Sequence, residues 1–221
     1  MAYDLEEQEQ IDTLKAFWNQ YGNLVTWILI AALGSYAGYN FWNSHQRSQA
    51  AEASSLYDEL QKQLAAKDNA KVQRIAADVE TKYTSSTYAQ MSALGAAKSA
   101  FEASDLKTAK AQLQWVIDHG SDEYKALAKL RLSGVLLDEK AFDQALALLG
   151  GEFPSQFIGA VSDRKGDVLV AQNKLAEART AYTAALTAMG EKSPGRQLVT
   201  LKLESIGGTV PAAPGAPAKA A

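Results

Sequence analysis

The chain lacks cysteine: none of its 221 residues is one. This absence excludes disulfide bonds, thiolate metal sites, a cysteine nucleophile and the acyl anchor of a lipoprotein. Histidine is scarce as well, because only His45 and His119 occur and 74 residues separate them. Neither a histidine-pair metal site nor a catalytic triad can be recognised from that spacing.

The sequence motifs of common enzymes are also missing. There is no Walker loop, no G-x-S-x-G motif and no G-x-G-x-x-G motif. Several carboxylates fall where solvated helix faces are expected, namely Glu59, Asp78, Glu102 and Glu177. We therefore predict that the protein is not an enzyme and uses no cofactor, no metal ion and no small-molecule substrate. The alternative is an enzyme with an unrecognised site, which a deep pocket holding convergent polar side chains would identify.

An excess of positive charge is missing too. The formal net charge is −3, the sequence pI is about 5.5, and no run of Lys or Arg is longer than a pair. A basic field that would attract phosphate backbones is therefore absent, and we expect no nucleic-acid partner. A content of 47% hydrophobic and 21% charged residues predicts a folded globular domain.

Formal charge disappears altogether between Lys15 and Arg47. About 20 apolar residues suffice for a helix to cross the hydrocarbon layer of a membrane, so we predict a transmembrane helix over residues 21–42 and a lipid bilayer as a partner. Aromatic residues gather at both ends of the run, as expected where a helix meets the two headgroup layers. They are Phe17, Trp18 and Tyr21 at one end and Tyr39, Phe41 and Trp42 at the other.

Two other interpretations of this run remain open. A cleaved signal peptide has a cut site available at Ser35-Tyr36-Ala37, and a helix of a soluble core would also be apolar. The acidic start MAYDLEEQEQIDTLK favours a retained anchor, because a signal peptide begins with basic residues. The flanking charges Lys15 and Arg47 specify the orientation of the transmembrane helix poorly. By the positive-inside rule they slightly disfavour an outward-facing C-terminal domain.

Small residues within the run suggest a packing face. Gly34 and Gly38 form a G-x-x-x-G motif, and Ala31 and Ser35 have the same spacing on the adjoining face. Such spacing lets a second transmembrane helix approach closely. Glycine is also common in membrane helices generally, so a partner helix is one of two explanations.

The rest of the chain predicts an all-α domain. Residues from Ser48 to about Ile206 are rich in the helix formers Ala, Leu, Lys and Gln and contain only Pro154 and Pro194. The end of the chain, GGTVPAAPGAPAKAA, has the composition of a flexible tail. The expected segments are an acidic tail at 1–20, the transmembrane helix at 21–42, a tetratricopeptide-like helical domain at 43–206 and a disordered Pro/Ala-rich tail at 207–221.

An internal repeat indicates the architecture of this domain. The stretch KGDVLVAQNKLAEARTAYTAAL has the spacing of a tetratricopeptide repeat, and RLSGVLLDEKAFDQALALL and LGAAKSAFEASDLKTAKAQLQWV precede it at similar intervals. One small or apolar position recurs every 33 to 36 residues, at Ile75, Ala109, Ala145 and Ala178. We predict a helical solenoid; a generic Ala-rich bundle is the alternative.

Close packing between the two helices of each repeat explains the alanines. A longer side chain at Ala109, Ala145 or Ala178 would overpack the crossing, and Leu149 and Tyr182 are expected to pack beside them. The segment SPGRQLVTLKLESI, with Leu198, Leu201 and Leu203, is expected to close the last repeat as a capping helix.

A solenoid offers a concave surface lined by the first helix of each repeat, which suits an extended peptide or a helix of a partner. The repeat frame places Asp138, Asp163 and Asp167 as candidates for this groove. Solubilising surface charge is the alternative role for these three aspartates.

The order of these features resembles the YfgM family of Gram-negative bacteria. The resemblance runs from about Tyr3 to Gly207 and rests on the acidic tail, the anchor ending in YNFW, the stretch KYTSSTYAQMSALGAAKSAF and the two repeats that follow. It implies a single-pass protein of the bacterial inner membrane, with residues 1–20 in the cytoplasm and the tetratricopeptide-like domain in the periplasm.

The same resemblance implies a function. Members act as ancillary subunits of the Sec translocon, associate with the membrane-anchored periplasmic chaperone PpiD and hand newly exported proteins to periplasmic chaperones. Some are credited with dampening a cytoplasmic stress-response regulator. A membrane-tethered scaffold of another envelope-assembly or division complex would share the same sequence features and is the alternative function.

Overall fold

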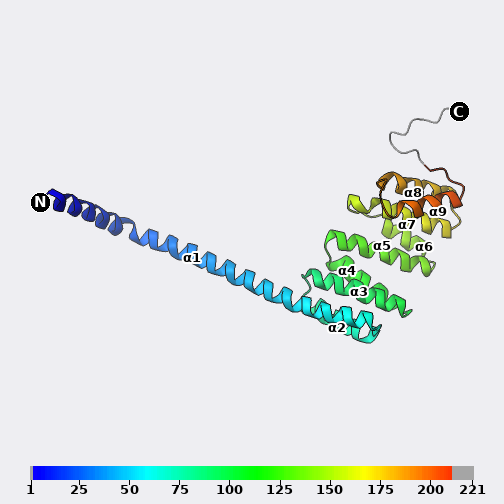
Figure 1. Cartoon of the computed structure of the whole chain (residues 1–221), viewed down its shortest axis with the longest axis horizontal. Helices are drawn as coiled ribbons and strands as arrows, with labels where there is room; N and C mark the ends of the chain where they lie inside the picture. The colour runs from blue at the N-terminus through cyan, green and yellow to red at the C-terminus, as the bar shows by residue number, and fades with distance from the viewer. Residues whose placement is uncertain (1, 211–221) are drawn as a thin grey trace, which may run out of the picture. The chain divides into compact units, whose positions relative to one another are not determined.

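The computed structural model describes the backbone of residues 2–210 and the side chains of residues 9–210. All regular secondary structure in this part of the chain is helical, which confirms the predicted all-α fold (Figure 1). The chain divides into one unit ending at Glu52 and another beginning at Ala53, and each is described by itself. The elements are α1 (Ala2–Ala65), α2 (Asn69–Lys82), α3 (Thr87–Glu102), α4 (Leu106–His119), α5 (Asp122–Asp138), α6 (Phe142–Leu149), the 3₁₀ turn η1 (Ser155–Phe157), α7 (Ile158–Ala171), α8 (Leu175–Ala188) and α9 (Arg196–Ser205).

Helix α1 is continuous from the predicted transmembrane segment into the helical domain. This continuity has a local cause, because neither glycine nor proline occurs between Tyr39 and Ala65 and good helix formers follow Arg47. The helix stops only before Lys67, whose φ of 56° is incompatible with a right-handed helix.

The N-terminal unit exposes its apolar side chains. Trp27 is 65% exposed, Leu33 66% and Phe41 76%, and the most apolar part of α1 is not buried. The segment Glu9–Ala65 is the one helix among the described residues that is long and apolar enough to cross a membrane. A cleavable signal passes the same test, so retention of the anchor stays a prediction.

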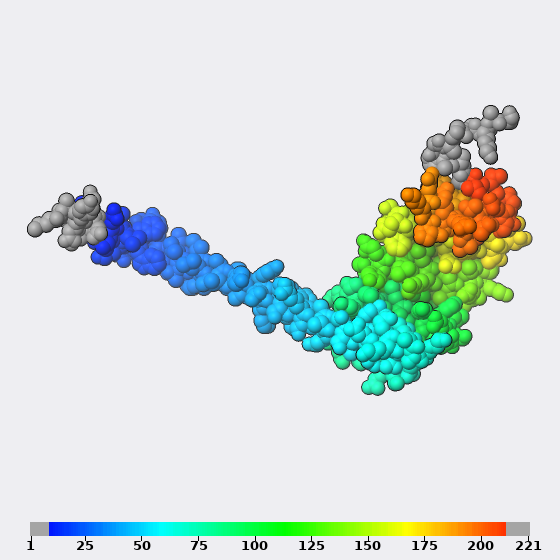
Figure 2. All heavy atoms as spheres, in the orientation of Figure 1, coloured from blue at the N-terminus to red at the C-terminus, as the bar shows by residue number. Residues whose placement is uncertain are grey.

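The second unit is a stack of helices that follow one another in space as they do in sequence (Figure 1). From α2 to α9 each helix packs on the next, and α5 also contacts α7. The last part of α1 joins this unit, because Leu60 packs with Val72 of α2 and Ala96 of α3. Figure 2 shows these helices as a continuous body of side chains, coloured from cyan to red. A regular solenoid, with repeats related by one common rotation, stays a prediction.

One turn recurs four times in this stack. Lys67, Ser104, Lys140 and Asn173 all have a φ between 56° and 62°. In each case the positive-φ residue directly precedes the N-cap residue of the following helix, α2, α4, α6 or α8. In the first two turns an aspartate caps the helix: Asp68 accepts from the amide of Lys71 at 3.1 Å and Asp105 from that of Thr108 at 3.0 Å. The shared turn marks equivalent positions in successive helical hairpins.

These turns correct the sequence frame of the first hairpin. Counting four residues from the N-cap gives Val72, Ala109, Ala145 and Ala178, and all four are completely buried. Ile75, the position chosen from the period alone, is only half-buried. Ile75 lies three residues after Val72, and an apolar helix face repeats at that interval, so periodicity could not distinguish the two.

Helix α9 packs on α8 at the C-terminal end of the stack, where the sequence predicted a capping helix. Val199 and Leu203 are its buried residues, at 1% and 0% exposed. The expectation for two of the leucines is wrong, because Leu198 and Leu201 are 57% and 56% exposed. Val199 and Leu203 are four residues apart on one helix face, which explains why they are buried together.

Candidate functional site

The small residues of the anchor lie open. A Cβ atom added at Gly34 or Gly38 would meet no heavy atom within 4 Å. On the adjoining face the Ser35 hydroxyl donates to the carbonyl oxygen of Ala31 at 2.8 Å, so its hydrogen bond is made within the helix. The backbone here is accessible to a second helix, and the role of these four residues in packing against one stays a prediction.

The predicted repeat-packing residues lie in the interior of the second unit. Ala109, Ala145, Ala178 and Leu149 are completely buried, and Tyr182 is 3% exposed. The Tyr182 ring lies against the backbone of Gly166, and its hydroxyl donates to Asp167 Oδ1 at 2.8 Å. Ala178 and Tyr182 pack in the cluster that holds α8 against α7, whereas Ala145 and Leu149 of α6 belong to a separate cluster.

The structure does not bring the three candidate groove aspartates together. Asp163 and Asp167 of α7 both accept from Lys202 of α9, with Nζ at 2.8 Å and 2.7 Å from their Oδ1 atoms. Burial raises the pKa of Asp163 above its ordinary value, although the hydrogen bond from Lys202 acts in the opposite direction. These two aspartates therefore tie α9 to α7, whereas Asp138 lines an open hollow that neither of them lines.

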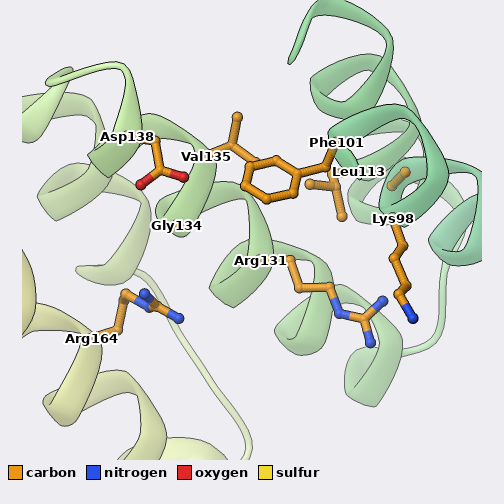
Figure 3. Close-up of a pocket in the computed structure, with 9 residues that line it drawn as sticks. Lys98, Phe101, Leu113, Arg131, Gly134, Val135, Asp138 and Arg164 are labelled. Atoms are coloured by element: carbon orange, nitrogen blue, oxygen red, sulfur yellow. The ribbon is translucent and has the colours of Figure 1, made fainter. Parts of the chain in front are cut away.

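The hollow has a volume of about 530 Å³ and is formed by α3, α4, α5 and α7 (Figure 3). We call it the α3–α5–α7 groove, because α4 contributes only Leu113. Its charged lining residues are Lys98, Arg131, Asp138 and Arg164. Its apolar lining residues are Ala97, Phe101, Leu113 and Val135. The groove is lined mainly by the first helices of successive hairpins, the surface for which the sequence predicted partner binding.

Sequence reasoning missed the cations of this groove. Arg131 and Arg164 each stand nine residues before a positive-φ turn residue, Lys140 and Asn173 respectively. They therefore occupy the same position of two adjacent hairpins, 33 residues apart. That recurrence is visible in the sequence, but only once the turns define the frame.

A buried carboxyl group lies on α2, outside the groove. Glu80 Oε1 is inaccessible and has no hydrogen-bond partner among the described residues, and the same is true of Gln112 Oε1 on α4. Burial raises the pKa of Glu80 from 4.5 to about 7, while the nearby His119 and a hydrogen bond donated by Gln112 act in the opposite direction. His119 is itself the last residue of α4.

Stability is expected to depend on pH through Glu80. The pKa is higher in the folded state than in the unfolded state, so the folded state binds more protons between about pH 4.5 and 7 and loses stability as the pH rises. Glu80→Gln should remove this penalty. After discounting for partial exposure, it should stabilise the protein by about 1–2 kcal/mol at about pH 8 and by little at about pH 4.5.

Urea unfolding of the two proteins at both pH values measures this difference. Asp78→Asn is the matched control, since Asp78 lies on the same helix with a half-exposed side chain paired with Lys82. A gain for Glu80→Gln that is equal at both pH values would contradict the assignment of the raised pKa.

A helix long and apolar enough to cross a membrane, followed by stacked helical hairpins with an open groove, defines a class: a helical-hairpin domain that follows a candidate membrane helix. In agreement, the family model described as a tetratricopeptide repeat-like domain matches residues 15–208. No solved structure matches the chain.

Relatives of similar length narrow the class to one family. The chain is 35% identical over 210 residues to a Neisseria gonorrhoeae protein named ancillary SecYEG translocon subunit, covering 93% of this chain and all of the relative. Proteins of the same name from Haemophilus influenzae and Escherichia coli are 28% and 31% identical, over 93% and 80% of this chain and 100% and 86% of theirs. The chain belongs to this family, the YfgM family that its sequence resembles. None of these relatives is named as an enzyme, in agreement with the predicted non-catalytic protein.

Proposed function

We propose that this protein is an ancillary subunit of the Sec translocon that links protein export to periplasmic chaperones. The single observation that carries the translocon part is the similarity along nearly the whole chain to relatives that bear this name. Because the matched region of the relative extends over its full length, anchor and helical domain are matched together.

The proposed location is the bacterial inner membrane. Residues 21–42 cross it once, the acidic tail 1–20 lies in the cytoplasm and the domain 43–206 lies in the periplasm. The uncovered apolar surface of α1 supports insertion into a bilayer, since soluble proteins rarely expose apolar patches of that extent. The periplasmic side follows from the family resemblance, because the flanking charges Lys15 and Arg47 do not specify it.

We assign each proposed partner to a different surface of the protein. The open face of Gly34 and Gly38 suits a helix within the bilayer, and we assign it to the translocon core. The stacked hairpins suit a partner outside the bilayer, and we assign them to a membrane-anchored periplasmic chaperone of the PpiD type.

Co-purification from detergent-solubilised membranes tests this division. The wild-type chain should recover both the translocon core and the anchored chaperone. Replacing Gly34 and Gly38 together with leucine should leave insertion intact, because hydrophobicity rises, yet reduce the recovered translocon several-fold. Ala32→Leu with Tyr36→Leu is the matched control, since these positions lie on the opposite face at 100° per residue and are also exposed.

A second variant and a topology measurement complete the test. Deleting residues 48–206 should abolish chaperone recovery and leave the anchor in the membrane. Protease added to spheroplasts should digest the domain after Arg47 and spare the acidic tail. A protected domain would place the hairpins in the cytoplasm and contradict the periplasmic role. An accessible domain with neither companion recovered would favour a scaffold of another envelope-assembly complex.

A further inference from the structure

We propose that the α3–α5–α7 groove is a docking site for an acidic, partly apolar peptide segment of a partner protein. The proposal rests on the proposed function only in taking the occupant to be a protein. It adds the chemistry that the partner must present and the residues that recognise it.

The groove carries more positive than negative charge. Lys98, Arg131 and Arg164 line it, and Asp138 is its one acidic lining residue. Figure 3 shows these side chains arranged around the open space, with the guanidinium groups of Arg131 and Arg164 extending from α5 and α7. Because the whole chain has a net charge of −3, this local excess runs against the average charge of the molecule. Charge complementarity therefore favours an anionic occupant.

The cations of the groove are poorly neutralised within the described structure. Among the described residues Arg131 has neither an ion pair nor a side-chain hydrogen bond, and its partial burial lowers its pKa from the ordinary value. The Nη1 atom of Arg164 lies 3.8 Å from Asp167, but that carboxylate is held more closely by Lys202, at 2.7 Å. Lys98 has only an exposed partner, Glu102, at 3.7 Å. Such exposed pairs contribute little, so an added carboxylate would find donors available.

Repetition places the two arginines in series. Arg131 and Arg164 hold the same position in adjacent hairpins, so their side chains leave neighbouring helices on the same face. The Arg164 guanidinium extends over Gly134 of α5, with Cζ 3.7 Å from the position of an added Cβ. A guanidinium presents forked donors that match a carboxylate, and two in series suit successive carboxylates of a peptide.

An apolar floor lies between the charges. The Phe101 ring is 42% exposed although it sits beside the buried side chains Leu113 and Val135 (Figure 3). An exposed aromatic ring in a hollow gains contact area when an apolar side chain covers it. The combination favours a peptide with alternating acidic and apolar residues over a small inorganic anion, which would leave the ring uncovered.

Peptide binding to the purified full chain in uncharged detergent micelles tests the proposal. The probe is a fluorescein-labelled peptide of about eight residues, Glu-Leu-Glu-Ser-Glu-Phe-Glu-Gly, and the comparison peptide has Gln in place of every Glu. Fluorescence anisotropy should show that the acidic peptide binds and the comparison peptide does not. The binding should weaken as salt is added. Arg131→Gln with Arg164→Gln should lower its affinity at least about tenfold, which corresponds to about 1.4 kcal/mol.

The control variant changes the net charge of the protein by the same amount as the groove variant but leaves the groove residues unchanged. Arg74→Gln with Lys125→Gln removes two positive charges from residues outside the lining and should retain the wild-type affinity. Phe101→Ser should weaken binding of the acidic peptide without changing its dependence on salt. If the double glutamine variant melts early, Arg131→Lys with Arg164→Lys keeps the charge and should recover most of the affinity while losing the forked geometry.

Three outcomes would overturn the proposal. The first is equal binding of the acidic and the comparison peptide. The second is an equal loss of peptide affinity in Arg131→Gln with Arg164→Gln and in the control variant. The third is displacement of the peptide by phosphatidylglycerol vesicles, which would indicate that the groove binds a lipid headgroup. The assay contains no translocon, so its failure contradicts the groove assignment alone. Failure of the wild-type chain to recover the translocon from membranes contradicts the proposed function alone.

Discussion

Ala178→Glu is expected to destabilise the helical domain by about 4 kcal/mol, a large fraction of the stability of an ordinary domain. Ala178 is completely buried on α8, in the cluster that includes Leu169, Tyr182 and Leu203. A glutamate there would place an unpaired carboxylate in apolar surroundings and force apart helices that meet at an alanine. Ala145 is equally buried in the neighbouring cluster, and Ala145→Glu should have an effect of the same size.

Thermal unfolding followed by circular dichroism measures this effect. Glu177→Ala is the matched control, because Glu177 is the preceding residue and is exposed. Glu177 lies in the first turn of α8, so removing its charge should cost about 0.3–1 kcal/mol through the helix dipole. Equal melting temperatures for the two variants would show that the repeat frame is wrong.

Gly166→Ala should also destabilise the domain, by about 2–3 kcal/mol, although alanine is the better helix former. A Cβ at Gly166 would overlap the Tyr182 ring, with Cζ at 2.8 Å and two ring carbons closer still. The ring cannot move aside freely, because Tyr182 is 3% exposed and its hydroxyl donates to Asp167, which Lys202 holds in turn. The added methyl group therefore overpacks the contact between α7 and α8.

At a second glycine, Gly134, substitution by alanine is expected to have the opposite effect on stability. Gly134 lies in the interior of α5, where the atoms nearest to an added Cβ belong to the Arg164 guanidinium, at an ordinary contact distance of 3.7 Å. Gly134→Ala should therefore stabilise the domain by about 0.5–1 kcal/mol. Urea unfolding of both variants tests the pair, and a change of the same sign for the two would contradict the close approach of Tyr182 to Gly166.

Much of the architecture could be predicted from local sequence patterns. The all-α fold follows from the abundance of helix formers and the scarcity of proline, since these preferences act within a few residues. The candidate transmembrane helix follows from a charge-free run of sufficient length, which needs no knowledge of the rest of the chain. The buried alanines Ala109, Ala145 and Ala178 could be located because small residues recur at a fixed period.

The candidate site depended on information that no local pattern contains. Whether Val72 or Ile75 is equivalent to Ala109 is decided by the turn at Lys67, because both lie on the apolar face and only the chain reversal sets the register. Asp163 and Asp167 are paired with Lys202 of α9, a residue more than 30 positions later, and no local pattern predicts that contact.

The groove itself is a product of tertiary structure. Arg131, Arg164 and Phe101 lie on three different helices, and each alone has the pattern of an ordinary helix surface. The sequence by itself determined the helices, the apolar segment and the repeat period, because those depend on residues adjacent in the chain. Only the packing of α3, α5 and α7 decided which charged side chains share one hollow, because that convergence depends on how the helices cross.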